Sequence, residues 1–190
     1  MIQIAIFASG SGTNAVNIYQ YFNQSKNINI GVIITDNPTA GIIEKARQLS
    51  IPVEIVDKAT RTSTEIVELL DSYAIDFIVL AGYLKLIPPV LIKAYPNKIV
   101  NIHPALLPNY GGKGMYGMHV HQAVINNKAT HSGITIHVVN EQYDKGKILV
   151  QKAFSLKGIH NAEQLANEIH QYEYQYYPRV IEAYIKSISI

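Results

Sequence analysis

The strongest constraint on the fold is an alternation in the first hundred residues of short Ile- and Val-rich runs with amphipathic segments. Continuous apolar runs of this length are typical of strands buried on both faces of a sheet. The runs are Ile2–Ala8, Ile28–Thr35, Pro52–Val56, Phe77–Ala81 and Ile99–Ile102, and the segments with helical spacing are Asn14–Phe22, Ala40–Leu49 and Thr64–Tyr73. This order predicts a doubly wound α/β fold, with a mostly parallel sheet and helices on both faces.

The second half of the chain departs from this pattern. Pro104–Gly117 is rich in Pro and Gly and is expected to be a loop. Gly133–Val139 and Lys147–Phe154 are expected to form a late antiparallel extension of the sheet. A long helix is predicted from Asn161 to about Lys186, kinked or divided at Pro178. With no repeat or linker, residues 1–190 are predicted to form a single domain.

Composition narrows the class of protein. The chain has 190 residues and no Cys, so disulfides and thiolate chemistry are excluded. A net charge of +2 is too weak to indicate a nucleic-acid surface. No apolar stretch approaches a membrane span, and Ile2–Ala8 lacks the basic region of a signal peptide. We therefore expect a cytoplasmic protein that acts on small molecules, with no nucleic-acid or membrane partner; its oligomeric state is left open, a homodimer included.

The first candidate site is the segment Ser9–Asn14, directly after the first predicted strand. Gly10 and Gly12 permit a tight turn, and the N–H groups at the following helix start could hold a phosphate. A plain structural turn is the alternative. The same glycines also fit a loose dinucleotide fingerprint with Asp36 some twenty residues later, so an NAD-dependent oxidoreductase is a rival hypothesis. A further alternative is a nucleotide-binding protein without catalytic activity, which would need only this segment.

The second candidate site combines Asn101 and His103 at the carboxyl end of a predicted strand. Alternation places both side chains on one face, with Ile102 on the other. An amide that steadies an oxyanion beside an imidazole that moves a proton suits acyl transfer. Asp144, in a polar loop between the two late strands, is the obvious partner for His103. A buried carboxylate there would raise the pKa of His103.

Metal binding is a weaker hypothesis. His119 and His121 could form a metal pair at the start of a helix, but no carboxylate or further His cluster completes the site. We therefore predict no metal site.

Several of these segments together resemble the glycinamide ribonucleotide formyltransferase family. The resemblance is carried, in order along nearly the whole chain, by the Gly-Ser-Gly-Thr-Asn loop, Leu80–Ile87, Asn101–Pro108, Ser132-Gly133 with His137, and Asp144. It implies a formyltransferase fold and direct transfer of a formyl group from 10-formyltetrahydrofolate to the amine of glycinamide ribonucleotide, a step of purine synthesis. A related folate-dependent formyltransferase that acts on an amino-sugar nucleotide stays open as an alternative.

The resemblance also assigns residues to roles. It implies that Asn101, His103 and Asp144 are catalytic and that Gly12, Thr13 and Asn14 bind the substrate phosphate. It implies substrate binding by Glu173 and folate binding by Leu84, Lys85, Leu86, Ile87, Asn101, Asn140, Glu141 and Asp144. Arg61 corresponds to a further folate-contacting arginine once a gap is allowed. Two departures are Ala105, where the family usually has Ser, and the segment Tyr110–Gly117, which is longer than in many relatives and could form a mobile lid.

Overall fold

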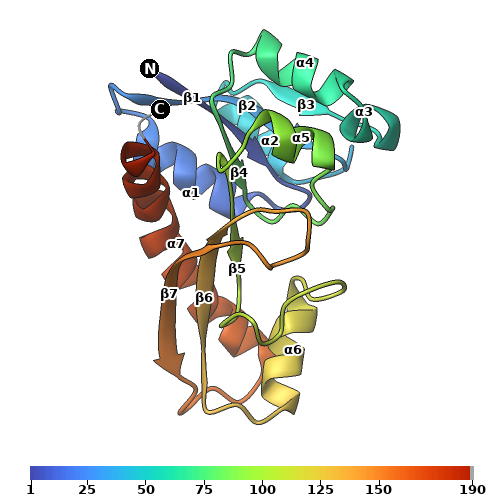
Figure 1. The fold of residues 1–190 in the computed structure, drawn as a ribbon. Helices are drawn as coiled ribbons and strands as arrows, with labels where there is room; N and C mark the ends of the chain where they lie inside the picture. The colour runs from blue at the N-terminus through green and yellow to red at the C-terminus, as the bar shows by residue number, and fades with distance from the viewer. Residues whose placement is uncertain (189–190) are drawn as a thin grey trace.

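The computed structural model describes residues 1–188, which contain a seven-stranded sheet of order β3-β2-β1-β4-β5-β6-β7 (Figure 1). The strands are β1 (Ile2–Phe7), β2 (Ile28–Thr35), β3 (Val53–Ile55), β4 (Phe77–Leu80), β5 (Ile99–His103), β6 (His131–Val138) and β7 (Ile148–Ser155). The first five pair in parallel, whereas β6 and β7 join by antiparallel pairing. The predicted fold class, with its late antiparallel extension, is confirmed.

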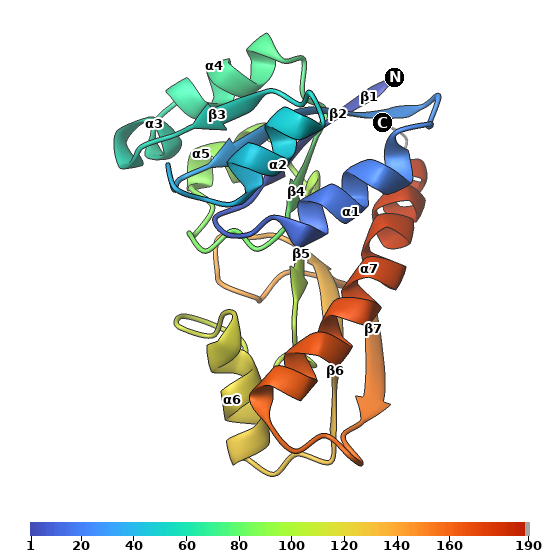
Figure 2. The ribbon, with the colours of Figure 1, turned by 180° about the vertical axis from the view of Figure 1, so that it is seen from behind.

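Helices cover both faces of the sheet. They are α1 (Thr13–Phe22), α2 (Ile42–Gln48), α3 (Lys58–Thr62), α4 (Glu65–Ser72), α5 (Pro89–Ala94), α6 (Met118–Asn126) and α7 (Ala162–Ser187). One core cluster packs α1, α2, α6 and α7 against one face, and a second packs α4 and α5 against the other. Figure 2 shows α7 lying beside α1 along one side of the molecule.

The strand order creates a switch point between β1 and β4. From β1 the chain proceeds outward through β2 to β3, then returns to add β4 on the opposite side of β1. The loops that follow β1 and β4 therefore leave in opposite directions, and ligands of open α/β sheets bind in the crevice between such loops.

Three local predictions differ from the structure. The short helices α3 and α5 were not expected, and α5 begins at a Pro-Pro pair that suits a helix start. Thr62 and Glu65 have the sequence spacing of a capping box, but Thr62 ends α3 and its hydroxyl donates to the Lys58 carbonyl. A capping box needs its serine or threonine at the N-cap, and that position is Thr64.

The last helix is continuous through Pro178. It spans 26 residues with the proline inside, and Pro178, Tyr177 and Ile181 are buried. The Tyr177 hydroxyl donates to the carbonyls of Leu80 and Val100, which ties the helix to β4 and β5. Of the two predicted effects of Pro178, a kink or a division, the division is wrong, because packing against the sheet holds both halves in one element.

Candidate functional site

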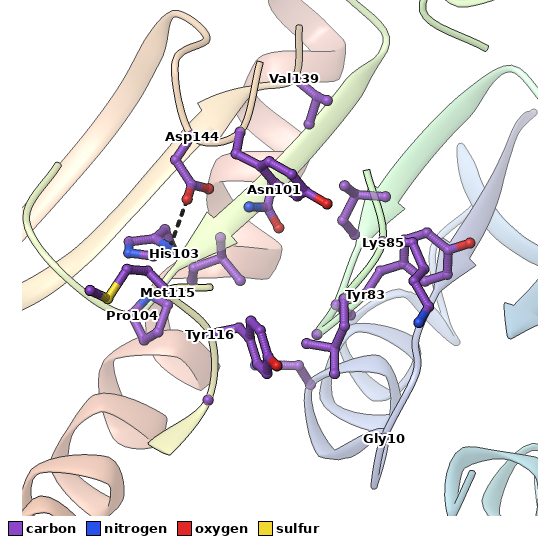
Figure 3. Close-up of a pocket in the computed structure, with 18 of the residues that line it drawn as sticks. Gly10, Tyr83, Lys85, Asn101, His103, Pro104, Met115, Tyr116, Val139 and Asp144 are labelled. Atoms are coloured by element: carbon purple, nitrogen blue, oxygen red, sulfur yellow. Dashed lines mark ion pairs between the residues drawn. The ribbon is translucent and has the colours of Figure 1, made fainter. Parts of the chain in front are cut away.

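A cavity of about 610 Å³ lies beyond the carboxyl ends of β1, β4 and β5. Its lining comes from the segment after β1, the segment after β4, the end of β5, the loop before α6, the loop after β6 and one turn of α7. Figure 3 shows side chains from these segments converging on one space. The fold and this cavity together define an open α/β protein that binds small molecules at its switch point.

The segment Ser9–Asn14 forms the predicted turn into α1. Gly12 has a φ of 72° and stands at the N-cap of α1, whose first turn carries no acidic residue. A Cβ at Gly12 would lie 2.4 Å from Ile42, whereas a Cβ at Gly10 would meet nothing within 4 Å. Gly12 is therefore required by the fold itself, and Gly10 is the glycine that leaves room beside the cavity. The unpaired N–H groups of the first helical turn suit an anion.

Asn14 differs in detail from its expected role as a phosphate ligand. Its Nδ2 donates to Glu173 Oε2 at 2.8 Å, which fixes the orientation of the amide because a carboxylate only accepts. The side-chain oxygen is buried and makes no hydrogen bond among residues 1–188. A phosphate at this helix start would be held by backbone N–H groups, with the Asn14 side chain linking the turn to α7.

The segment after β4 forms the apolar wall of the cavity. Leu84 and Leu86 are 43% and 40% exposed although large and apolar, and Lys85 and Ile87 line the cavity with them. Exposed leucines in a concave wall suit a flat apolar ring system. The segment predicted to bind folate therefore presents apolar side chains to the cavity, and its contact with folate stays a prediction.

Asn101, His103 and Asp144 meet at one end of the cavity. His103 Nδ1 lies 3.6 Å from Asp144 Oδ2, the contact drawn in Figure 3, and both side chains are almost fully buried. Asn101 lies beside them on β5 and faces the same space. The contact between His103 and the loop carboxylate, which the sequence could not show, is present.

Burial dominates the electrostatics of His103. Burial lowers the pKa of His103 below its usual value, and the Asp144 carboxylate and the Tyr110 carbonyl offset only part of that effect. The Asp144 carboxylate does act to raise this pKa, as expected, but burial lowers it by more, so the net shift is downward. Both ring nitrogens nevertheless face acceptors, because Nε2 lies 2.8 Å from the Tyr110 oxygen. The imidazolium, once formed, would have a hydrogen-bond acceptor at Nε2 and a carboxylate 3.6 Å from Nδ1.

Asp144 stays ionised in this setting. Burial alone would raise its pKa, but the neighbouring His137 and His103 side chains and the Gly112 N–H together lower it. The Gly112 N–H donates to Oδ2 at 2.8 Å. A carboxylate that accepts several hydrogen bonds keeps its charge.

His137 is a site residue that the sequence interpretation did not assign. It stands opposite Asn101 in the antiparallel β5–β6 pair. Its Nδ1 lies 2.9 Å from the Val138 carbonyl, so Nδ1–H donates there and Nε2 is free to accept from Asn101 Nδ2 at 3.2 Å. His137 therefore orients the Asn101 amide. Its signal was the Ser132-Gly133 motif that carried the resemblance, but no role followed from it.

Glu173 lies on α7 and lines the part of the cavity that contains Asn14. It is 5% exposed and accepts hydrogen bonds from Asn14 and from His170 Nδ1, the latter at 2.9 Å. The hydrogen bond to Glu173 raises the pKa of His170. His170 and the buried His121 also line this part, and neither was assigned from the sequence.

Two of the predicted folate residues lie away from the cavity wall. Glu141 is exposed, whereas its neighbours Asn140, Gln142 and Tyr143 line the cavity. Arg61 lies at the end of α3 near Tyr83, outside the lining. Burial raises the pKa of the Tyr83 hydroxyl to about 12, the Asp36 charge adds to this effect, and Arg61 partly offsets it. In this structure Arg61 is a neighbour of the wall rather than part of it.

Asp36, on which the rival hypothesis of a dinucleotide site depended, has partners within the protein. Its Oδ1 accepts from the Ser9 hydroxyl at 2.5 Å, and its Oδ2 lies 3.5 Å from Lys85 Nζ. The same Ser9 hydroxyl accepts from the Leu84 N–H at 3.1 Å. Asp36 is outside the cavity lining, so the residue that suggested an NAD site instead joins the turn after β1 to the segment after β4.

The two histidines considered as a metal pair lie on different sides of α6. His119 is exposed and His121 is buried, as residues two apart on a helix should be. Among residues 1–188, no group of three or more His, Asp or Glu is placed to hold a metal ion. None of the helices in this part of the chain has the length and apolar character needed to cross a membrane.

Comparison with known proteins assigns the chain. The formyl transferase family profile matches residues 2–181. Phosphoribosylglycinamide formyltransferase of Bacillus subtilis is 33% identical over 188 residues, covering 96% of this chain and 94% of the relative. The chloroplastic protein of that name from Arabidopsis thaliana is 43% identical, and this chain covers 64% of its length. The chain thus spans less than two thirds of that plant relative.

Solved structures agree with this result. The crystal structure of phosphoribosylglycinamide formyltransferase from Bacillus halodurans superimposes with a TM-score of 0.86 at 38% identity, covering 96% of this chain and 95% of that one. The structure of that name from Streptococcus pneumoniae gives 0.84 at 32% identity, covering 96% and 98%. The chain belongs to the formyl transferase family.

Proposed function

We propose that this protein transfers the formyl group of 10-formyltetrahydrofolate to the amine of glycinamide ribonucleotide, in purine synthesis. The observation that carries the proposal is the meeting of Asn101, His103 and Asp144 at one end of a cavity whose other end is a helix start suited to phosphate. The names of the relatives support the same substrates.

The two ends of the cavity suit the two ends of the ribonucleotide. Its phosphate would lie at the start of α1, against the N–H groups that follow Gly12. Its amine would then reach the region of His103. The folate co-substrate would lie along Leu84–Ile87 and Asn140, with its formyl group near Asn101, and it supplies the activated one-carbon unit.

The side chains at the reacting end have complementary tasks. As the amine attacks, the formyl oxygen gains negative charge, and a donor held beforehand in a dry site stabilises that charge strongly. Asn101, oriented by His137, would donate to that oxygen. His103, once protonated, would stabilise it by its positive charge, because its two ring nitrogens face the Tyr110 carbonyl and Asp144. Asp144 would stabilise the imidazolium from the other side. Proton movement from the amine to the leaving nitrogen is assigned to water near Asp144.

No covalent intermediate with the protein is needed. The chain has no Cys. The serine that lines the cavity, Ser11, has no hydrogen bond from its hydroxyl to a histidine or carboxylate among residues 1–188, so no base activates it. Ser9 is buried outside the lining, with its hydroxyl engaged by Asp36 and Leu84. Direct attack by the substrate amine is therefore the proposed route.

Incubation with 10-formyltetrahydrofolate and glycinamide ribonucleotide, followed by folate absorbance, tests this function. We expect turnover that requires both compounds. Amino-sugar nucleotides offered in place of the ribonucleotide test the remaining alternative substrate. Turnover with an amino-sugar nucleotide but not with glycinamide ribonucleotide would contradict the proposed substrate while retaining the formyl transfer.

A further inference from the structure

Three polar residues form a row across the last three strands of the sheet. His103 on β5 is paired with Thr135 on β6, and Thr135 is paired in turn with Gln151 on β7, the outermost strand. Side chains of directly paired residues lie on the same face of a sheet, so this row leads from the sheet edge to the imidazole of the site. Thr135 is fully buried, whereas Gln151 is exposed and lies outside the cavity lining.

The Thr135 hydroxyl and the Gln151 amide together hold the segment that follows β5. The Thr135 hydroxyl donates to the Ala105 carbonyl at 2.6 Å and accepts from the Leu107 N–H at 3.0 Å. Gln151 Nε2 donates to the Leu107 carbonyl at 2.8 Å and to the Thr135 oxygen at 3.0 Å. A hydroxyl has one hydrogen and two acceptor sites, and an amide nitrogen has two hydrogens, so all of these positions are used.

These two side chains supply the hydrogen bonds that join this segment to the sheet. Among residues 1–188, segment 104–109 is otherwise held by one internal hydrogen bond, from the Asn109 N–H to the Leu106 carbonyl at 3.1 Å. The path of the chain directly after His103 therefore depends on Thr135 and Gln151.

The segment held in this way sets the surroundings of the His103 ring. It ends three residues before Tyr110, whose carbonyl lies 2.8 Å from His103 Nε2. Because a carbonyl only accepts, Nε2 carries the hydrogen of the neutral ring, and the proton that forms the imidazolium is taken up at Nδ1, beside Asp144. The position of the Tyr110 carbonyl thus selects the ring nitrogen that takes up the proton.

We propose that Gln151 is a positioning residue for the reaction, which acts through Thr135 and the Ala105–Leu107 segment to keep the Tyr110 carbonyl on His103 Nε2. Gln151 is outside the cavity lining, so it contacts neither substrate. Its effect on turnover rests on the proposed function, whereas its effect on the His103 ring is independent of any substrate.

Three variants separate this role from a general effect on the sheet edge. In Gln151→Met the side chain keeps a similar length and loses both hydrogen bonds. In Gln151→Lys the side chain is longer and again supplies donors, so it can return to the Leu107 carbonyl and the Thr135 oxygen. Gln48→Met is the matched control, because the Gln48 amide donates to Glu44 on its own helix, α2, and lies outside the main cavity.

NMR of histidine-labelled protein, titrated with pH in the absence of substrate, measures the first effect. The His103 signal is the one missing from His103→Ala. Burial lowers the pKa of His103, and the Asp144 carboxylate and the Tyr110 carbonyl act against that effect. Gln151→Met should therefore lower this pKa further, Gln151→Lys should recover most of the change, and Gln48→Met should titrate as the unaltered protein does.

The other groups that affect this ring are unchanged in these variants. They are Asp144, His137 and Glu173, and Gln151 makes no hydrogen bond to any of them within residues 1–188. A shift in the titration of the ring therefore reports the position of the carbonyl.

Steady-state kinetics with both substrates measure the second effect. Gln151→Met should lower kcat about tenfold, the size of one lost hydrogen bond, with little change in KM for either substrate because the cavity lining is intact. The limb of the kcat profile due to His103 should move to lower pH together with the NMR titration.

An unchanged His103 titration in Gln151→Met would overturn the proposal, and so would equal kcat and KM values for Gln151→Met and Gln48→Met. Equal losses of kcat in Gln151→Met and Gln151→Lys, with a lower melting temperature in both, would assign Gln151 to the fold alone. If the unaltered protein transfers no formyl group, the proposed function fails, while the NMR titration still tests the positioning role.

Discussion

Replacing Asp144 with Asn tests the electrostatic core of the proposed mechanism. Asparagine keeps the shape and can still accept from the Gly112 N–H, but it removes the charge that lies 3.6 Å from His103 Nδ1. Two opposite charges at about 4 Å attract by about 4 kcal/mol at an effective dielectric constant of about 20. If that attraction is gained only when His103 becomes protonated, its loss lowers turnover about a thousandfold.

Steady-state kinetics and calorimetry on the same preparation supply the measurement. The turnover number should fall as stated, while affinity for the ribonucleotide changes little because its phosphate lies at the start of α1. The pH profile should shift as well. Burial already lowers the pKa of His103 and Asp144 partly offsets this, so without that charge the limb due to His103 moves to lower pH.

A double substitution shows whether the two side chains act as one unit. Adding His103→Ala to Asp144→Asn should cost little more than either change alone, because groups that act together are strongly non-additive. Effects that multiply independently would refute the coupled pair. Asp144 would then have to act elsewhere, most plausibly on the water that moves the proton.

Three further predictions follow from the geometry. The Gly10→Val variant should fold normally and, in calorimetry, bind the ribonucleotide far more weakly while folate binding changes little. The Gly12→Ala variant should have a lower melting temperature, because its Cβ would overlap Ile42. Equal losses of affinity for both ligands in Gly10→Val would show that the turn only supports the fold. Residues 110–117 should gain hydrogen-exchange protection when both substrates are bound, since they carry several glycines at positive φ and line the cavity mouth; unchanged exchange would indicate a static loop. The free energy of unfolding should fall as pH drops below about 6.5, because burial lowers the pKa of His103 and His121, so the unfolded chain binds protons that the folded chain does not. Urea titrations at several pH values should show a weaker pH dependence for His121→Leu. An unchanged dependence would argue against a neutral buried ring.

The sheet could be predicted well from the sequence, for a physical reason. Parallel strands buried on both faces are continuous apolar runs, and Ile28–Thr35 was placed at the bounds that the structure gives. The short helices α3 and α5 were missed because so few residues show no clear period. Pro178 misled the interpretation of α7, since a proline predicts a break only where packing does not compensate.

The site was predictable in parts. Strand-end position brought Asn101 and His103 to attention, but their partner Asp144 comes from a loop some forty residues later and needed the fold to place it. The direction in which the pKa of His103 shifts depends on how deeply the ring is buried, and a sequence motif does not show that. His121 had been considered only as half of a metal pair, because its lack of a partner becomes visible only in three dimensions.

The Ser9 hydroxyl has a consequence for anyone who recombines this protein with its relatives. A hydroxyl has one proton, and here it is committed to Asp36 while the oxygen accepts from Leu84. The turn after β1 and the segment after β4 thus share a single atom, and Lys85 meets the other oxygen of the same carboxylate. A chimera that takes residue 9, residue 36 or residues 84–85 from a relative without the others would leave a buried hydrogen-bond donor or a buried charge without its partner. Residues 9, 36 and 84–85 should therefore be exchanged together, although they are far apart in the sequence.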